Sequence, residues 1–394
     1  MKTAIIHYWL VGMRGGERVL EQLCRLFPEA DIYTHVYAPD RISDVITRHN
    51  IRCTSIARLP YARKLYSKYL GFMPHALEHI DLSGYDLVIS SESGPAKGVI
   101  APPGACHICY CHSPMRYIWD YFHSYRSELG FPARTVFDHV AHRLRQWDVT
   151  TASRVDRFVA NSAFVAKRIQ RYYGRRADVV HPPVSLDKFR PVADPSRDFY
   201  LIAGELVSYK RVDLAVEVFR GLDRKLVIAG RGSAAAKLQR NAPANVEFLG
   251  RVSDEALARL YANCRALLFP GEEDFGLVPL EVMASGRPVI AYGAGGALES
   301  VKEFETGLFF RQQNAGALRA AIVRFEEMEA QFSPVRVRRH AEEFSEERFR
   351  EKFMQIVAQE LGRPSLSGIK PVPATDGTRH PAAENPVRMP AGTP

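Results

Sequence analysis

The chain lacks any apolar run long enough to cross a bilayer. Of its 394 residues 46% are hydrophobic, yet no stretch of about 18 uncharged apolar residues occurs, so no membrane-spanning helix is expected. The first residues, MKTAIIHYWLVGMRGG, hold only a short apolar run without a small-residue cleavage site. We interpret them as a first strand rather than a secretion signal. The length suits two domains of ordinary size in a cytoplasmic protein.

Cysteine is scarce, and its spacing is not that of a secreted disulfide framework. Cys106, Cys109, Cys111 and His112 look superficially like metal ligands. However, their segment is compact and largely apolar, and no second Cys/His pair completes a zinc site. We therefore interpret these cysteines as small buried residues of a strand, and we predict no metal site.

Acidic residues are too few to balance the basic ones in the first half of the chain. The formal net charge is +9, and residues 1–200 hold 27 Lys and Arg against 19 Asp and Glu. We expect an anionic partner to approach this half. Charge alone allows either a nucleic acid or an anionic membrane.

The most informative stretch runs from residue 266 to residue 296. Residues 266–270 and 288–292 are apolar runs that predict buried strands, and residues 277–285 predict a helix. An acidic loop, residues 271–276, joins the first strand to the helix. Together they form a βαβ unit, and such units bind ligands at the carboxyl ends of their strands.

The loop and the helix start would place polar groups in that crevice. We expect Glu273 and the backbone amides of Phe275, Gly276 and Leu277 to face it, with Glu281 in the first turns of the helix. A helix N-terminus offers free N–H groups and partial positive charge, which suit an anionic ligand. Carboxylates beside a phosphate site suit a ligand that also carries hydroxyls. This combination indicates a nucleotide sugar.

Glu273 and Glu281, set in E-D-F-G-L-V-P-L-E, resemble the E-x7-E motif of retaining glycosyltransferases of family 4. The likeness covers roughly residues 2–361, because the segments YCHSPMRYIWD, VANSAFVAKRI and GELVSYKRVDLAVEVF follow in the same order. It implies an α/β GT-B fold, in which two Rossmann-like doubly wound domains face each other across a cleft. We expect an acceptor-binding domain, a nucleotide-sugar-binding domain, a helix that crosses back to the first domain and a disordered tail, at residues 1–190, 191–343, 344–362 and 363–394.

The resemblance also implies roles for single residues. Glu273 would contact hydroxyls of the transferred sugar, and Glu281 the hydroxyls of the ribose. Lys210 would hold the departing diphosphate. His112, at the carboxyl end of a predicted strand, would hydrogen-bond a sugar hydroxyl or the backbone near the anomeric carbon as a neutral imidazole.

Glu205 departs from the family pattern. It stands where most members have Arg, although Lys210 matches the lysine of the same phosphate-binding segment. Arg211 is therefore our candidate for the second positive charge, unless Glu205 binds in another way. Arg251 and Val252 lie in the segment that resembles the nucleobase-binding region.

Two further segments are candidates for donor contacts. Gly15 and Gly16 precede a helix and let the backbone approach donor phosphate or acceptor, although a tight turn without a ligand is the alternative. Ser162 starts another helix, where it either contacts the donor or only caps the helix. Arg168, within that helix, belongs to a basic cluster that we expect to be solvated.

Residues 58–72 predict an amphipathic helix. In projection one half is aromatic and apolar and the other is basic. A helix of this kind is typical of proteins that lie on an anionic bilayer, although a surface helix packed on its own domain gives the same pattern. The candidate membrane or acceptor contacts are Arg58, Arg63, Lys64 and Lys68.

The resemblance implies transfer of a hexose from a nucleotide diphosphate with retention. The bond breaks through an oxocarbenium-like state, while fixed amides and a lysine stabilise charge on the leaving phosphate. The sequence has no D-x-D, so we expect no metal and no other cofactor. A covalent role for Glu273 would require a second carboxyl about 5 Å away, and the sequence offers no clear candidate. More plausibly, the leaving phosphate takes the acceptor's proton, with front-face retention.

Within the family, the three segments quoted above most resemble bacterial mannosyltransferases that use GDP-mannose in O-antigen (lipopolysaccharide) and exopolysaccharide assembly. This implies a polyprenyl-diphosphate-linked oligosaccharide acceptor and peripheral attachment to the anionic inner face of the plasma membrane. An enzyme of the same fold using a UDP-sugar, for glucosyl or galactosyl transfer, is the alternative. A nucleic-acid-binding protein would also suit the positive charge, but the unit from Glu273 to Glu281 would not serve it, so we expect no nucleic-acid partner.

Overall fold

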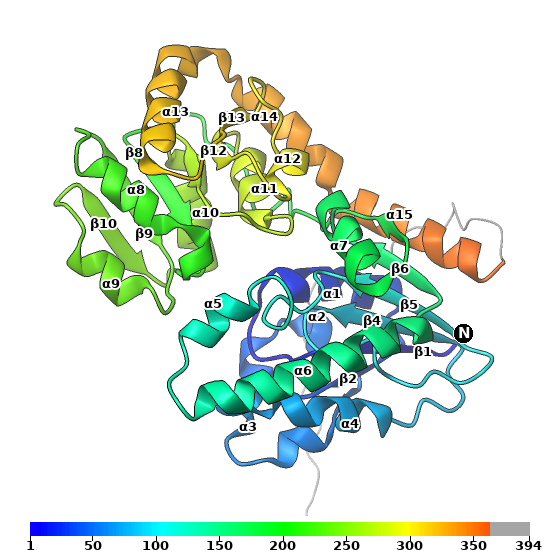
Figure 1. The fold of residues 1–394 in the computed structure, drawn as a ribbon. Coiled ribbons are helices and arrows are strands. Elements are labelled where there is room, and N and C mark those ends of the chain that lie inside the picture. The colour runs from blue at the N-terminus through cyan, green and yellow to red at the C-terminus, as the bar shows by residue number, and fades with distance from the viewer. Residues whose placement is uncertain (363–394) are drawn as a thin grey trace, which may run out of the picture.

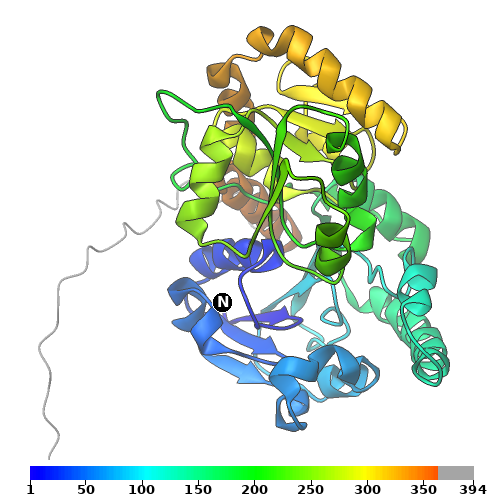
Figure 2. The ribbon, with the colours of Figure 1, turned by 90° about the vertical axis from the view of Figure 1, so that its left-hand side faces the viewer.

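The computed structural model describes residues 1–362; the tail predicted for 363–394 lies outside the described residues. Two parallel sheets form the centres of two domains, each packed between helices (Figure 1). A perpendicular view shows the two domains stacked one on the other (Figure 2). The two Rossmann-like domains predicted from the sequence are therefore confirmed.

The sheet of the N-terminal domain has the order β3-β2-β1-β4-β5-β6-β7, with every pair parallel. The chain builds to one side of β1 and then returns to its other side at β4, so the topological switch point lies between β1 and β4. The strands are β1 Thr3–His7, β2 Asp31–Thr34, β3 Ile51–Cys53, β4 Leu87–Glu92, β5 Cys106–Cys111, β6 Arg157–Ala160 and β7 Ala177–Val179.

The sheet of the C-terminal domain repeats this plan in the order β10-β9-β8-β11-β12-β13, again parallel. Its switch point lies between β8 and β11. The strands are β8 Phe199–Ala203, β9 Lys225–Ala229, β10 Val246–Gly250, β11 Leu267–Phe269, β12 Val289–Tyr292 and β13 Gly307–Phe310.

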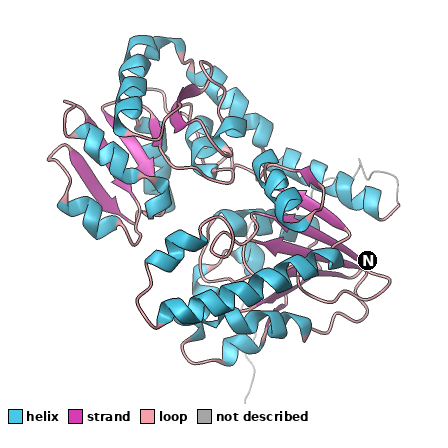
Figure 3. Ribbon diagram, viewed as in Figure 1, coloured by secondary structure: helices cyan, strands magenta, loops and turns pink. Residues whose placement is uncertain are grey.

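Helices cover both faces of each sheet (Figure 3). Those of the N-terminal domain are α1 Gly15–Leu26, α2 Asp44–Thr47, α3 Ala62–Leu65, α4 Met73–Glu78, α5 Phe122–Ser127, α6 Ala133–Thr151 and α7 Ala163–Tyr173. Those that follow are α8 Val212–Phe219, α9 Ala235–Arg240, α10 Asp254–Asn263, α11 Leu277–Ala284, α12 Ala297–Ser300, α13 Ala315–Met328, α14 Pro334–Ala341 and α15 Glu346–Glu360.

The central strands are buried on both sides, as their continuous apolar sequences require. Every residue of β1, β4 and β8 is buried. Helix α15 returns to the N-terminal domain (Figure 1), where Phe349 and Phe353 pack against Tyr110 of β5. Within residues 1–362, no helix is both long and apolar enough to span a membrane.

The single helix predicted over residues 58–72 is wrong. A 3-10 helix ends at Arg58, the one-turn helix α3 follows, and a second 3-10 helix, η3, covers Tyr66–Phe72. Pro60 disfavours helical geometry in the residue before it, and Tyr61 adopts a left-handed φ of 51°. Tyr61, which the projection placed on the apolar half, is consequently 77% exposed.

A charged cluster lies inside the N-terminal domain. Lys97, Glu92 and Asp148 are each 0% exposed. Lys97 Nζ is 2.9 Å from Glu92 Oε1 and also pairs with Asp148, whose second oxygen accepts hydrogen bonds from Trp119 (2.8 Å) and Tyr173 (3.0 Å). Burial raises the pKa of Glu92. The cluster joins β4 to α6 and α7, and its stability depends on the one lysine.

Replacing Lys97 with Met should lower the free energy of unfolding by about 3–5 kcal/mol, because two buried carboxylates lose their cation. Because the pKa of Glu92 is raised in the folded state, its ionisation at higher pH disfavours folding, and it does so more when Lys97 is absent. The loss of folding free energy in the variant should therefore grow between pH 5 and pH 8. Urea unfolding at both pH values measures it. Lys225→Met is the control, because it removes an exposed ion pair with Glu247 and should change stability far less. Equal losses in the two variants would contradict the prediction.

Candidate active site

The two switch points face each other across one cleft. Residues that follow β1, β4 and β5 line it from the N-terminal domain, and residues that follow β8 and β11 line it from the C-terminal domain. Ligands of doubly wound sheets bind at such points. The cleft has a volume of about 2020 Å³, whereas a pocket for one small molecule takes roughly 300–1,000 Å³. It therefore has room for two reactants.

The loop between β11 and α11 forms the floor of the cleft on the C-terminal side. Its sequence folds as predicted into strand, loop, helix and strand, and Gly276 takes a φ of 82° at the start of α11. Phe275, Gly276 and Leu277 line the cleft. No side chain within residues 1–362 caps the first amides of α11, so this helix start is open to an anionic ligand.

Glu273 and Lys210 meet in this cleft. Lys210 Nζ lies 3.0 Å from Glu273 Oε1, and their side chains are 17% and 18% exposed. A Cβ at Gly271 would lie 2.7 Å from Lys210 Cα, so only glycine lets the loop pack this closely on the lysine backbone. The structure thus brings together two of the three residues that the sequence assigned to catalysis.

Glu281 faces the cleft one turn further along α11. Its Oε2 accepts a hydrogen bond of 2.9 Å from the hydroxyl of Tyr261. Burial raises the pKa of Glu281. Arg251 and Val252 also line the cleft.

His112 lines the cleft from the N-terminal domain, directly after β5. Its Nε2 is 2.9 Å from Ser91 Oγ, which is in turn 3.0 Å from Nδ1 of His7. Burial, together with the charge of His7, lowers the pKa of His112 to about 3. The imidazole is therefore neutral near pH 7 and can accept or donate a hydrogen bond.

Gly15 and Gly16, the first two residues of α1, also line the cleft. A Cβ at Gly16 would lie 2.2 Å from the Tyr8 hydroxyl, and one at Gly15 would lie 3.2 Å from Cδ1 of Leu277 in the other domain. The starts of α1 and α11 thus face each other across the cleft. The absence of a side chain at Gly16 is what allows α1 to begin here.

Two predicted donor contacts are placed elsewhere. Arg211 does not line the cleft: it starts α8 with a left-handed φ of 51°, and its guanidinium pairs with Asp213 at 3.1 Å. Ser162 is 0% exposed. It caps α7 by accepting a hydrogen bond of 3.1 Å from the Val165 amide, and it donates to the backbone oxygen of Asp274 at 2.6 Å. The structure gives Ser162 a capping and interdomain role instead of the donor contact.

Several cleft residues were not assigned from the sequence. Arg14 lies 3.8 Å from Glu205 of the other domain, so the glutamate that replaces the usual family arginine faces an arginine across the cleft. The ring of Tyr209 stacks on that of Tyr121, with 5.2 Å between centroids. Arg231 also lines the cleft. No local sequence signal pairs residues of two different domains.

The basic segment reaches the edge of the cleft. Arg58, Arg63, Lys64 and Lys68 are exposed, and Lys68 lines the cleft together with apolar residues of η3 and α6. Large hydrophobic side chains lie exposed on these two neighbouring elements and on the loop that leads into α6: Phe72 (63%), Phe131 (88%) and Val136 (62%).

In the part of the chain that the structure describes, no group of three or more His, Cys, Asp or Glu residues could hold a metal ion. Cys106, Cys109 and Cys111 lie on β5, partly or fully buried, as the interpretation of this segment as a strand requires.

Comparison with solved structures confirms the GT-B fold. HepE of Anabaena, solved in complex with UDP, superposes with a TM-score of 0.66 over 91% of this chain and 100% of that chain. The sequence identity is 14%, so this likeness concerns the fold alone.

Sequence comparison finds glycosyltransferases among the curated relatives. The GDP-mannose-dependent alpha-mannosyltransferase of Mycolicibacterium smegmatis is 37% identical over 174 residues, which cover 41% of this chain and 46% of that protein. The D-inositol 3-phosphate glycosyltransferase of Rhodococcus erythropolis is 32% identical over 228 residues, 48% of this chain and 50% of that protein. The chain spans about half the length of the curated relatives that it matches.

Two family models match adjoining parts of the chain. The model described as Glycosyltransferase Family 4 matches residues 13–188, and the model described as Glycosyl transferases group 1 matches residues 185–347. The chain therefore has the GT-B fold, and each of its two domains is similar to a glycosyltransferase domain.

Proposed function

We propose that the protein is a retaining hexosyltransferase that moves mannose from GDP-mannose onto a polyprenyl-diphosphate-linked saccharide. The observation that carries the proposal is the pairing of Glu273 with Lys210 at the open start of α11, inside the interdomain cleft. A nucleotide sugar needs a cation and amides for its diphosphate and a carboxylate for its hydroxyls, and this site offers all three.

The donor would rearrange the pair on binding. Its diphosphate would replace the Glu273 carboxylate as the partner of Lys210, and the freed carboxylate would accept hydrogen bonds from the sugar. Glu281, held by Tyr261, would accept from the ribose hydroxyls. Charge developing on the leaving phosphate would then meet a fixed ammonium and the amides of α11 in a cleft shielded from water.

On the opposite wall, neutral His112 would hydrogen-bond a sugar hydroxyl beside the anomeric carbon. The acceptor hydroxyl would attack from the face that the diphosphate leaves, and its proton would pass to the departing phosphate. This front-face course retains configuration without a covalent intermediate on Glu273.

The second positive charge would come from another residue than the one predicted. Because Arg211 pairs with Asp213 outside the cleft, we assign this task to Arg231 and Arg14, which both line it. With Lys210 they would supply enough charge for a diphosphate. We therefore propose that the reaction needs no metal, in keeping with a chain that has no D-x-D.

The lipid-linked acceptor would enter between η3 and α6. This side of the cleft is apolar and carries Lys68 at its rim, and exposed Phe72, Phe131 and Val136 lie close by. An isoprenyl chain suits the apolar wall, and its diphosphate suits the basic rim. We propose that this surface rests on the anionic inner face of the plasma membrane.

Mannose has its support in the curated relative whose name specifies GDP-mannose. The alternative donor, a UDP-sugar, has its support in the solved structure of HepE, which holds UDP. Binding of a nucleic acid would engage the basic surface alone and would leave the Glu273–Lys210 site without a role.

With GDP-mannose and a polyprenyl-diphosphate oligosaccharide, the purified protein should release GDP, and the rate should not change in EDTA. UDP-glucose and UDP-galactose should give background release. Turnover with UDP-sugars alone would instead establish the alternative donor. Activity lost in EDTA and restored by Mg²⁺ would overturn metal independence.

Glu273→Ala should reduce transfer by at least about 100-fold, the size of effect seen when one preorganised transition-state contact is removed. Circular dichroism should show that the variant still folds. The control is Glu272→Ala, which removes a neighbouring carboxylate that does not line the cleft. Comparable losses in the two variants would remove Glu273 from the proposed site.

Changing Arg63, Lys64 and Lys68 together to Glu should abolish flotation with vesicles rich in phosphatidylglycerol. Each basic residue near an anionic surface contributes about 1 kcal/mol, so removal of three should weaken partitioning by more than about 100-fold. The control changes Lys237, Arg240 and Arg259, exposed basic residues of the C-terminal domain, to Glu. Equal loss in both triple variants would show that only net charge matters and would contradict a docking surface on η3.

A further inference from the structure

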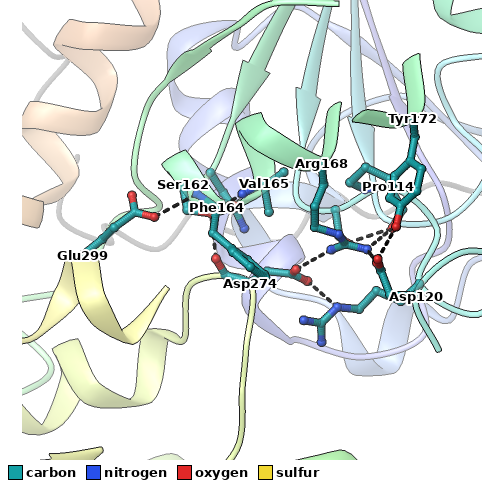
Figure 4. Close-up of polar contacts among 12 residues, drawn as sticks. Pro114, Asp120, Ser162, Phe164, Val165, Arg168, Tyr172, Asp274 and Glu299 are labelled. Atoms are coloured by element: carbon teal, nitrogen blue, oxygen red, sulfur yellow. Dashed lines mark hydrogen bonds and ion pairs between the residues drawn. The ribbon is translucent and has the colours of Figure 1, made fainter. Parts of the chain in front are cut away.

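Asp274, the residue after Glu273, is held by the opposite domain (Figure 4). Its Oδ1 lies 2.6 Å from Nη1 of Arg168 and its Oδ2 lies 2.9 Å from Nε of Arg116. Its backbone oxygen accepts the hydrogen bond from Ser162. Both carboxylate oxygens of Asp274 and its backbone oxygen are thus held by the N-terminal domain. Asp274 belongs to the loop of residues 271–276, which also carries Glu273 and is called the catalytic loop below.

Arg168 corrects a prediction, because it is not on a solvated face. It is 6% exposed. Its guanidinium donates to Ser113 Oγ at 2.7 Å and also pairs with Asp120 (Figure 4). Ser113 directly follows His112, and Asp274 directly follows Glu273. A single buried guanidinium therefore joins the loops that carry the two facing residues of the cleft.

The other side of the catalytic loop is closed by a glycine turn. The amide of Gly296 donates to the backbone oxygen of Glu273 at 2.9 Å. A Cβ at Gly296 would lie 2.2 Å from Phe275 Cα. The loop is confined between this turn and α7, so the direction of the Glu273 side chain depends on both.

A second interdomain contact is made by Glu299, which lies outside residues 271–276. The Glu299 carboxylate accepts the amides of Ala163 (2.7 Å) and Phe164 (3.0 Å), which caps α7 from the other domain (Figure 4). It also lies 3.1 Å from Nε2 of His181. Burial alone would raise the pKa of Glu299, but hydrogen bonds from His181 and the two amides lower it. This contact joins the domains without binding Asp274, and it reaches the loop only through the ring of His181, which stacks on Phe275.

We propose that Asp274 is a positioning residue, which makes the orientation of Glu273 depend on closure of the N-terminal domain through Arg168 and Arg116. The role of Glu273 in transfer rests on the proposed function; the dependence of the loop on the other domain does not. When the domains separate, Asp274 loses its contacts with Arg168, Arg116 and Ser162. Glu273 then loses its alignment with His112 on the N-terminal side of the cleft. Donor bound to the open C-terminal domain would then be protected from hydrolysis until the acceptor side is in place.

The first test needs no substrate. Asp274→Asn keeps the shape of the side chain and the bond to Ser162, but it removes the charge that holds both arginines. Hydrogen–deuterium exchange of the ligand-free protein should speed up in peptides that cover residues 271–276, because a contact that limits local opening is lost. Glu299→Gln should speed up exchange at residues 163–166 and leave 271–276 unchanged. Unchanged exchange of the catalytic loop in Asp274→Asn would overturn the proposal.

The second test separates positioning from binding. With the donor that the wild type uses, Asp274→Asn should lower kcat at least about 10-fold and leave the donor KM within about twofold, since alignment is lost while binding is kept. Arg168→Met should reproduce this loss, and the double variant should be no slower than the slower single variant, since the two act as one unit. An equal loss of kcat in Glu299→Gln would show that domain contact alone matters and would overturn the role of Asp274. A wild type that turns over no sugar nucleotide would refute the proposed function, whereas the exchange experiment would still decide whether Asp274 positions the loop.

Discussion

The ion pair between Lys210 and Glu273 is the interaction on which the site depends. Two groups of opposite charge, each less than one-fifth exposed, lie 3.0 Å apart where the central strands of one sheet end. In such a place each charge needs a partner, because burial without one is costly. A ligand that displaces one of them must supply its own charge for the lysine and its own hydrogen-bond donors for the carboxylate. A nucleotide sugar brings both kinds of group.

The parts of this site that could be predicted are those encoded within one short segment. The apolar runs around the loop at 271–276 and the glycine at its end determine strand, loop and helix locally, and so Glu273 and Glu281 were found. His112 was found because its segment resembles one of the family, which placed it at the end of a recognisable strand. In both cases neighbours in the sequence determine where the strand ends. Because parallel strands end at a common edge where ligands bind, the residue that follows the strand is expected in the site.

The parts that could not be predicted depend on residues that meet only after the domains fold together. Arg168 was expected in solvent because its neighbours Arg171 and Arg175 are also basic, but its partner Asp274 comes from the other domain. The projection over residues 58–72 failed because it assumed 3.6 residues per turn, whereas Pro60 and a left-handed Tyr61 break the segment into shorter turns. Arg211 was assigned because it is a cation next to Lys210. Its left-handed backbone instead directs the guanidinium toward Asp213.

The same dependence on two domains bears on Glu205, which departs from the pattern of the family that the sequence resembles. In this chain Glu205 faces Arg14, which starts α1 in the N-terminal domain. Positive charge is thus still present at this place in the cleft, but it is delivered from the opposite wall. The distribution of charge along the chain agrees, since the basic surplus lies in residues 1–200. Supplying a cation from the N-terminal domain would have a physical consequence: a diphosphate bound to the C-terminal domain alone would meet Lys210 and Arg231, whereas in the closed cleft it would also meet Arg14. Closure would therefore strengthen the hold on the leaving group at the same time as Arg168 fixes the loop that carries Glu273.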